Sequence, residues 1–294
     1  MRLRRALDKL GMALFVALAA LAVAPLFWLI ADVYIKGAAA IAKLGGLWTF
    51  LLCPPPTPFD KEGGVGPMLV GTLYMTALGA LAGFAVGFPL GVYIGEMGRE
   101  RLAQIARAGV NILVEFPTVA IGLFVYAVMS LAVDDLNRYI LSKLPGGWFL
   151  GPLEGFNAYA GAVALAIVMI PYVALATASA YASIERPLRE AAYGVGGREF
   201  NAVFIVLRKV VSRAVLTAAL IGTAKVAGET APLLFTAFGN AYYSPFTGPT
   251  GAVSLWIWYA AQSPYEVQIL SAYGAAAVLL TIVLVIFILA RVLR

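Results

Sequence analysis

Residues 68–94 read MLVGTLYMTALGALAGFAVGFPLGVYI, and none of them is charged. A helix needs about 20 consecutive apolar residues to cross the hydrocarbon core of a bilayer. This stretch is therefore long enough to span a membrane, and five other stretches of the chain have the same character. Together they predict an all-α integral membrane protein, a bundle of six transmembrane helices near residues 10–35, 68–94, 105–133, 156–182, 211–238 and 270–292.

The composition indicates a membrane protein and argues against most enzyme classes. Hydrophobic residues make up 62% of the 294 residues, and the mean hydropathy is +0.90. Charged residues make up 12%, whereas soluble domains contain about 25%. The chain has no histidine and one cysteine, Cys53, so it lacks the commonest general base and metal ligand. It also lacks a GxxxxGK[ST] phosphate loop. We expect no cofactor or metal here, and any ATP must be bound by another chain.

Basic residues gather on one side of the predicted membrane. With six spans, that side receives Arg2, Arg4, Arg5, Lys9, Arg99, Arg101, Arg107, Arg186, Arg189, Arg198, Arg208, Lys209, Arg213, Arg291 and Arg294. The opposite side receives Lys36, Lys43, Lys61, Arg138 and Lys143. The positive-inside rule therefore predicts that both termini are cytoplasmic. Because the net charge of +6 is explained by this orientation, we expect lipid and no nucleic acid as a partner.

The most organised polar segment is the predicted cytoplasmic loop, which begins ERPLREAAYGVGG at residue 185. Pro187 is a suitable first residue for a short helix. The glycines at 194, 196 and 197 would end that helix, because glycine accepts the left-handed conformations of a sharp turn. A second amphipathic helix would lead into the fifth span. Charge alone would also allow a plain topogenic loop.

The order of residues in this loop is more specific than its charge. Glu190, Ala191 and Ala192, followed by Gly196, resemble the EAA loop of ABC importer membrane subunits. The resemblance implies a coupling helix that docks on a cytoplasmic ATPase, with Glu190 and the two alanines at the contact and Gly196 at the turn. This chain has Arg208 and Lys209 where the family commonly has proline.

Further segments narrow the resemblance to the phosphate-specific ABC permeases of the PstA type. Residues 228–237 read GETAPLLFTA, and they resemble that family's signature. Other similar segments are PPPTPFDKEGGVGPMLVGTL (54–73), FPLGVYIGEMG (88–98), FPTVAIGLFVY (116–126) and SLWIWYAAQSP (254–264). The resemblance implies a multi-pass permease subunit of the cell membrane that is not itself an enzyme. It also implies four partners: a PstC-type second permease, a PstB-type ATPase pair that binds ATP and Mg, an external PstS-type phosphate-binding protein, and phosphate itself.

The hydropathy, the charge distribution and the resemblance, which begins near residue 50, together predict a domain division. Residues 1–9 are expected to form a cytoplasmic tail, and residues 10–35 the first transmembrane helix. Residues 36–67 are expected to be an external segment rich in proline and glycine. Residues 68–294 would be the core permease domain of the type I ABC importer kind, with five helices and the cytoplasmic coupling loop 183–210.

Two opposite charges interrupt the fifth predicted span. Lys225 and Glu229 are four residues apart, so they share a helix face. Each would cost about 2.5–3.5 kcal/mol if it were alone at the bilayer centre, and such residues are functional candidates. We predict that Lys225 and Glu229 line a translocation path, together with Gly228, Thr230 and Pro232. A purely structural ion pair that holds helices in register is the alternative. Another intramembrane charge, Glu115, is assigned a structural role.

Three other functions compete with phosphate import. An ABC importer for sulfate, molybdate or phosphonate would use the same loop and differ in cargo. A proton-coupled secondary anion carrier could use Glu229 and would need no ATPase. A membrane enzyme is the weakest alternative, because the chain has no paired acid and base residues and no histidine.

Overall fold

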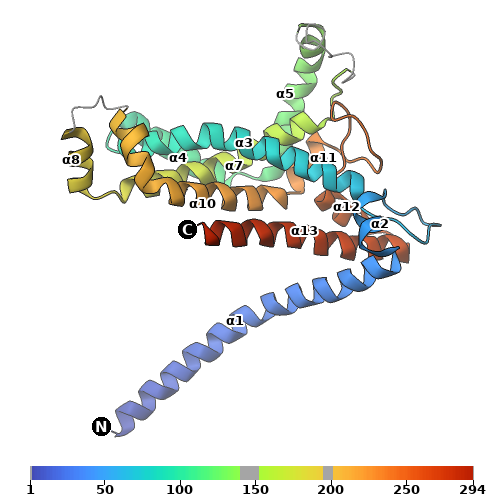
Figure 1. Ribbon diagram of the computed structural model, residues 1–294, viewed down its shortest axis with the longest axis horizontal. Helices are drawn as coiled ribbons and strands as arrows, with labels where there is room; N and C mark the ends of the chain where they lie inside the picture. The colour runs from blue at the N-terminus through green and yellow to red at the C-terminus, as the bar shows by residue number, and fades with distance from the viewer. Residues whose placement is uncertain (1, 140–151, 195–200, 294) are drawn as a thin grey trace.

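The computed structural model describes residues 2–139, 152–194 and 201–293 (Figure 1). Within these ranges the chain is helical, apart from loops and an isolated β-bridge between Phe238 and Thr250. The elements are α1 (Arg2–Lys43), α2 (Gly46–Leu52), α3 (Gly66–Glu96), α4 (Arg101–Glu115), α5 (Thr118–Tyr139), α7 (Ala158–Ala182), α8 (Arg186–Gly194), the π-helical turn η2 (Ala202–Leu207), α10 (Arg208–Ala227), α11 (Ala231–Thr236), α12 (Val253–Ala260) and α13 (Glu266–Val292). Five of them, α1, α3, α5, α7 and α13, are long and apolar enough to cross a membrane.

Two of the six predicted spans are not single helices. The third divides into α4 and α5, because Phe116 is extended (φ −73°, ψ 134°) immediately before Pro117. A residue before proline is driven out of the helical region by the proline ring. The fifth divides into α10 and α11 at residues 228–230. Helix α1 is longer than its predicted 10–35, since it begins at Arg2 and ends at Lys43.

Helices α3 and α7 pack with their backbones in close contact. Five of the glycines of α3 recur at every fourth residue, so they lie on one face of the helix. They are Gly79, Gly83, Gly87, Gly91 and Gly95. A Cβ atom built on any of them would come within 2.9 Å of an atom of α7. Small residues at this spacing are the usual means by which membrane helices approach closely. We call this row of five the glycine ladder.

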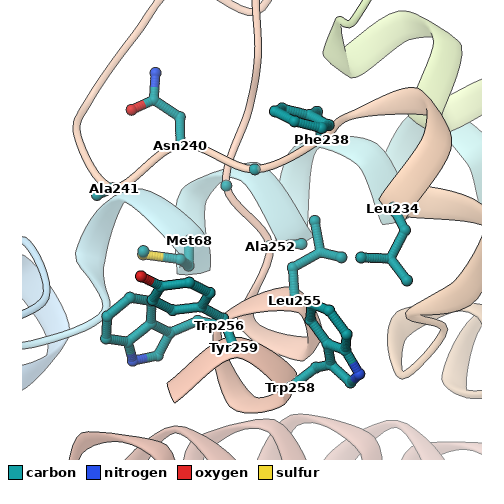
Figure 2. A pocket seen from close by; sticks show the side chains of 12 residues that line it. Met68, Leu234, Phe238, Asn240, Ala241, Ala252, Leu255, Trp256, Trp258 and Tyr259 are labelled. Carbon is teal, nitrogen blue, oxygen red and sulfur yellow. The ribbon is translucent and has the colours of Figure 1, made fainter. Parts of the chain in front are cut away.

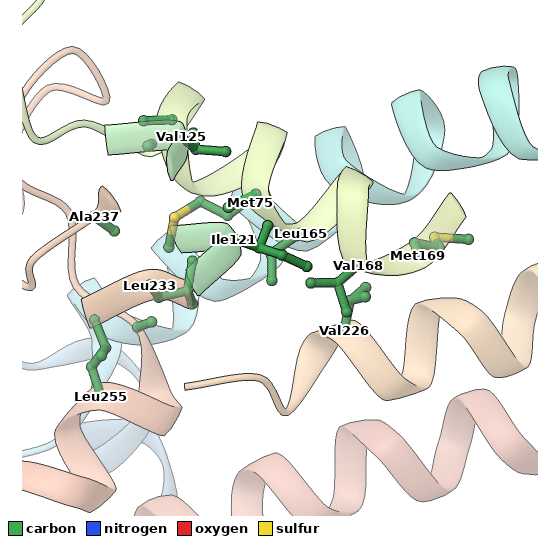
Figure 3. Close-up of a cluster of buried hydrophobic side chains, with 14 of the residues drawn as sticks. Met75, Ile121, Val125, Leu165, Val168, Met169, Val226, Leu233, Ala237 and Leu255 are labelled. Atoms are coloured by element: carbon green, nitrogen blue, oxygen red, sulfur yellow. The ribbon is translucent and has the colours of Figure 1, made fainter. Parts of the chain in front are cut away.

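The main apolar core lies where α5, α7, α10, α11 and α12 meet α3 (Figure 3). Met75 of α3 and Leu165 of α7 are fully buried there, beside Leu233 of α11. Gly122 of α5 is needed for this contact, because a Cβ at that position would lie 2.6 Å from the carbonyl oxygen of Pro232. The core therefore fixes the short helix α11 between α5 and α7.

Helix α1 packs against the rest of the described chain near its C-terminal end. It packs on α13, where the hydroxyls of Tyr34 and Thr281 lie 3.1 Å apart and Lys36 lies over the ring of Tyr273. Residues 12–29 are all exposed, and this part of α1 leaves the bundle (Figure 1). A helix that is apolar on all sides is stable in contact with lipid or another membrane protein, so this segment is suited to the bilayer.

Helix α12 lies at the end of the bundle opposite α8 (Figure 1). An apolar pocket of about 310 Å³ lies there (Figure 2). Met68, Leu234, Leu255 and the aromatic residues of α12 form much of its lining, and none of its lining residues is charged. The side chain of Trp256 is buried, and its indole N–H donates to the Ser271 hydroxyl over 2.9 Å. Trp258 is exposed.

Candidate functional site

The candidate site is the break between α10 and α11. Helix α10 ends at Ala227, and Gly228 caps it with φ −95° and ψ 0°. Helix α11 then starts at Ala231, with Pro232 in its first turn. Proline is well tolerated there, since the first turn has no partner for its missing N–H. The break lies directly before Pro232, which is where a proline interrupts a helix, because its ring clashes with the carbonyl group four residues earlier.

The predicted ion pair joins the last turn of α10 to the break that follows it. The Lys225 ammonium lies 3.3 Å from Oε1 of Glu229. The Lys225 side chain is 39% exposed and the Glu229 side chain 15% exposed. Lys225 also lies over the ring of Tyr172 of α7, 5.1 Å from its centroid, which is the geometry of a cation–π contact. The result is a half-exposed cation that is partly neutralised by a carboxylate and held beside an aromatic face.

The other predicted path residues differ in their access to the surface. Gly228 is exposed, and Glu229 and Thr230 are partly buried. Pro232 is buried against α5, so it does not line an open surface within this chain. A Cβ built on Gly228 would meet only the carbonyl oxygen of Lys225, at 3.9 Å, so no other part of the described chain packs closely against this glycine.

Sequence reasoning missed two contacts of the site. Tyr172 lies under Lys225, and the Ser254 hydroxyl of α12 donates to the Glu229 carbonyl oxygen over 2.8 Å. Both residues lie far from the break along the chain. No periodicity or motif links them to it, because the contacts arise from the packing of α7 and α12 against α10.

The predicted coupling loop contains the short helix α8, as expected. Glu190 and Ala191 are exposed on it, whereas Ala192 is 4% exposed and packs in a cluster with Tyr181 and Val203. Ala192 therefore faces its own bundle. Gly196 lies outside the described residues.

Neither Glu115 nor the arrangement of potential metal ligands indicates a second functional site. Glu115 is exposed at the end of α4, and it has no ion-pair partner among the described residues. No group of three or more potential metal ligands occurs in the part of the chain that the structure describes.

Comparison with known proteins places the chain in a transport family. Residues 87–294 match the family described as binding-protein-dependent transport system inner membrane component. The probable phosphate transport system permease protein PstA of Methanocaldococcus jannaschii is 37% identical over 96% of this chain and 91% of its own length. The phosphate transport system permease protein PstA of Haemophilus influenzae is 32% identical over 78% of this chain and 74% of its own length.

A solved structure shares the fold. A chain of the inward-facing MetNI methionine ABC transporter superposes with a TM-score of 0.55 and 20% identity, over 78% of this chain and 95% of that chain. The predicted fold class, a helical membrane bundle of the ABC importer permease kind, is confirmed. The apolar helices and the family description agree on a multi-pass protein of the cytoplasmic membrane. Since the family match covers most of the chain and these relatives are aligned over most of their length, the chain belongs to the binding-protein-dependent inner membrane transport components, as a permease of the PstA type.

Proposed function

We propose that this chain is the membrane-spanning subunit of an ATP-driven importer of inorganic phosphate. The observation that supports the proposal most is the 37% identity, over nearly the whole chain, to a probable phosphate transport permease. In this assignment the chain performs no chemistry itself. A partner ATPase of the PstB type binds ATP and Mg, a PstC-type chain completes the membrane unit, and a PstS-type protein delivers phosphate from outside.

The site at the α10–α11 break suits the passage of an anion. Phosphate needs positive potential and hydrogen-bond donors along its path, but an ion that is held too strongly does not leave. Lys225 supplies an ammonium, and Glu229 at 3.3 Å offsets part of its charge. The exposure of Lys225 and Gly228 leaves this cation reachable from one side of α10.

The geometry favours a path over a structural ion pair. A pair that holds two helices in register should join residues of different helices. Lys225 and Glu229 instead belong to one continuous segment, and the contacts to α7 and α12 are made by the Tyr172 ring and the Ser254 hydroxyl. The ion pair itself therefore joins no two helices, and the contact of the Lys225 ammonium with α7 is made to an aromatic ring.

Helix α8 is the proposed contact with the ATPase. Its exposed residues Glu190 and Ala191 offer a surface on which a groove can close, and Gly196 is assigned to the turn that follows. Helix α8 and both chain termini lie toward the same end of the molecule (Figure 1). That end is the proposed cytoplasmic side, in agreement with the distribution of basic residues.

Enlarging Ala191 should break this contact. Because Ala191 is exposed, Ala191→Trp should leave the fold of the chain intact while it fills the space that the ATPase needs. We expect the yield of co-purified ATPase to fall at least about tenfold, since hot-spot contacts at interfaces contribute about 2 kcal/mol or more. Ala191→Ser, which stays small, is the control. Wild-type ATPase yield with Ala191→Trp, at unchanged thermal stability, would remove α8 from the interface.

The function itself is tested by uptake of radiolabelled phosphate into proteoliposomes. They would contain this chain, its sister permease and the ATPase, with binding protein outside, ATP inside and excess sulfate as competitor. Uptake that needs ATP and resists sulfate is the expected result. ATP-dependent uptake of another anion in place of phosphate would overturn the substrate. Uptake without the ATPase would indicate a secondary carrier.

A further inference from the structure

A buried ion pair joins helix α8 to the end of α3. Nη1 of Arg189 lies 3.1 Å from Oε2 of Glu96, the last residue of α3. The Glu96 side chain is 5% exposed and that of Arg189 is 26% exposed. Neither residue belongs to the sequence motif of the coupling loop, although Arg189 directly precedes Glu190 in the chain.

The same guanidinium also binds the end of α7. Nη2 of Arg189 donates to the carbonyl oxygen of Tyr181 over 2.8 Å, in the last turn of that helix. Arginine can make two such directed bonds at once because its donors form a rigid fork, which lysine lacks. One side chain of α8 therefore holds the adjacent ends of α3 and α7.

The Tyr181 side chain extends this connection to the start of α10. Tyr181 is fully buried, and its hydroxyl lies 3.5 Å from the carbonyl oxygen of Val203 in the π-helical turn η2. Ala192 packs in the same apolar cluster, three residues after Arg189. Helix α8 is thus attached to the bundle by an ion pair and by apolar packing, while Glu190 and Ala191 remain exposed.

Arg189 and Glu96 would differ in their access to water if the ion pair were broken. A polar hollow of about 700 Å³ opens beside them, and its lining includes Arg99, Glu100, Arg186 and Arg189. Arg189 could turn into this hollow and be hydrated. Glu96 is almost completely buried, and removing a charged partner from a buried carboxylate is costly. The pair is therefore strongly favoured as long as α8 stays in place against α3.

We infer that Glu96 and Arg189 are positioning residues that transmit movement of α8 to the α3–α7 pair. The inference rests on the proposed docking of an ATPase on α8. When the ATPase displaces α8, the guanidinium draws the ends of α3 and α7 with it, so that ATP hydrolysis is converted into movement of the bundle. Of these attachments, α8 keeps only the Arg189 bond to Tyr181 and the packing of Ala192 when the ion pair is lost, so α3 would follow the movement of α8 incompletely. The expected defect is therefore loss of coupling, with ATPase binding preserved.

The test compares Glu96→Gln with Glu100→Gln in the full chain. Both changes remove one carboxylate charge near the same end of α3, but Glu100 is exposed and has no ion-pair partner among the described residues. Amide hydrogen exchange of residues 186–194, measured on the chain in lipid nanodiscs, reports the attachment of α8. Phosphate transported per ATP hydrolysed, measured in proteoliposomes with the complete complex, reports coupling.

For Glu96→Gln we expect exchange in α8 to accelerate about tenfold, because local opening becomes easier. Phosphate transported per ATP should fall about fivefold or more, since α3 would follow α8 incompletely. ATPase yield should stay at the wild-type level. Glu100→Gln should change neither quantity. Arg189→Lys, which keeps the charge and loses the fork, should give intermediate values of both.

Two outcomes would overturn the inference. Unchanged exchange in Glu96→Gln would show that the pair does not hold α8. Faster exchange with an unchanged ratio of phosphate to ATP would show that the attachment has no part in coupling. If the wild-type complex itself fails to import phosphate with ATP, the proposed function is wrong, and the exchange measurement still decides whether the pair holds α8.

Discussion

Replacing Gly91 with leucine is expected to abolish the folded bundle. A Cβ atom at this position would lie 2.5 Å from the carbonyl oxygen of Ala174 and 2.6 Å from Cβ of Thr177. The first of these is backbone, so no side-chain rotation can relieve the contact. Overpacking by a few methylene groups typically costs about 1–3 kcal/mol and occasionally more, and a whole leucine side chain would force α3 and α7 apart. We expect no monodisperse peak in size-exclusion chromatography after detergent extraction.

A matched pair of smaller changes makes this prediction quantitative. Gly91→Ala adds one methyl group at the crowded position and should lower the melting temperature. Gly109→Ala adds the same group on α4, where nothing lies within 4 Å of the new atom. Because alanine is a better helix former than glycine by about 1 kcal/mol, Gly109→Ala should raise the melting temperature slightly. Equal effects of the two alanine variants would mean that backbone contact at the glycine ladder does not determine stability.

Removing the charge of Lys225 is expected to stop most phosphate transport. Lys225→Ala should reduce ATP-dependent uptake at least about tenfold, the effect of losing about 1.4 kcal/mol of favourable interaction along the path. The ATPase should bind normally, since Lys225 lies in the last turn of α10, far along the helix from α8 (Figure 1). Lys225→Arg should retain uptake, because it keeps the charge and adds a second directed donor.

A double variant separates the path from the structural ion pair. In Lys225→Met with Glu229→Met, both charges are replaced by apolar groups of similar length. Such replacement of a buried or partly buried ion pair is often neutral or stabilising. A structural pair would therefore be rescued, and uptake would return. If Lys225 lines the path, the double variant should be stable in a thermal assay and remain defective in transport. Wild-type uptake by the double variant would contradict our assignment.

Much of the fold could be predicted because membrane insertion depends on local composition. The absence of charge in residues 68–94 was enough to place α3, and Pro187 was enough to place the start of α8 to within one residue. The break between α4 and α5 and the break between α10 and α11 could not be predicted from hydropathy, which also depends on local composition. The apolar runs continue through Phe116 and Gly228, and hydropathy averages over a window longer than either break. A stricter use of the rule for residues before proline would have found the first.

The site was predictable only in part, because packing decides which side chains meet. Lys225 and Glu229 could be paired from their spacing alone, and their contact is present. Tyr172 could not be added, since it lies on another helix. The partnership of Glu96 with Arg189 could not be predicted either, for they lie on elements far apart in the chain. Ala192 looked equivalent to Ala191, and only the packing of α8 on the bundle separates a buried position from an exposed one.

The glycine ladder has a mechanical consequence. From Gly79 to Gly95 the two backbones touch at every turn, over about 24 Å at about 1.5 Å per residue. Two helices in contact at so many points bend far less than one helix alone. We therefore expect α3 and α7 to tilt together as one rigid body. A tilt of about 10° at the end near Glu96 would then move the other end by about 4 Å, by simple geometry over that length. A displacement of that size is comparable to the width of a small oxyanion.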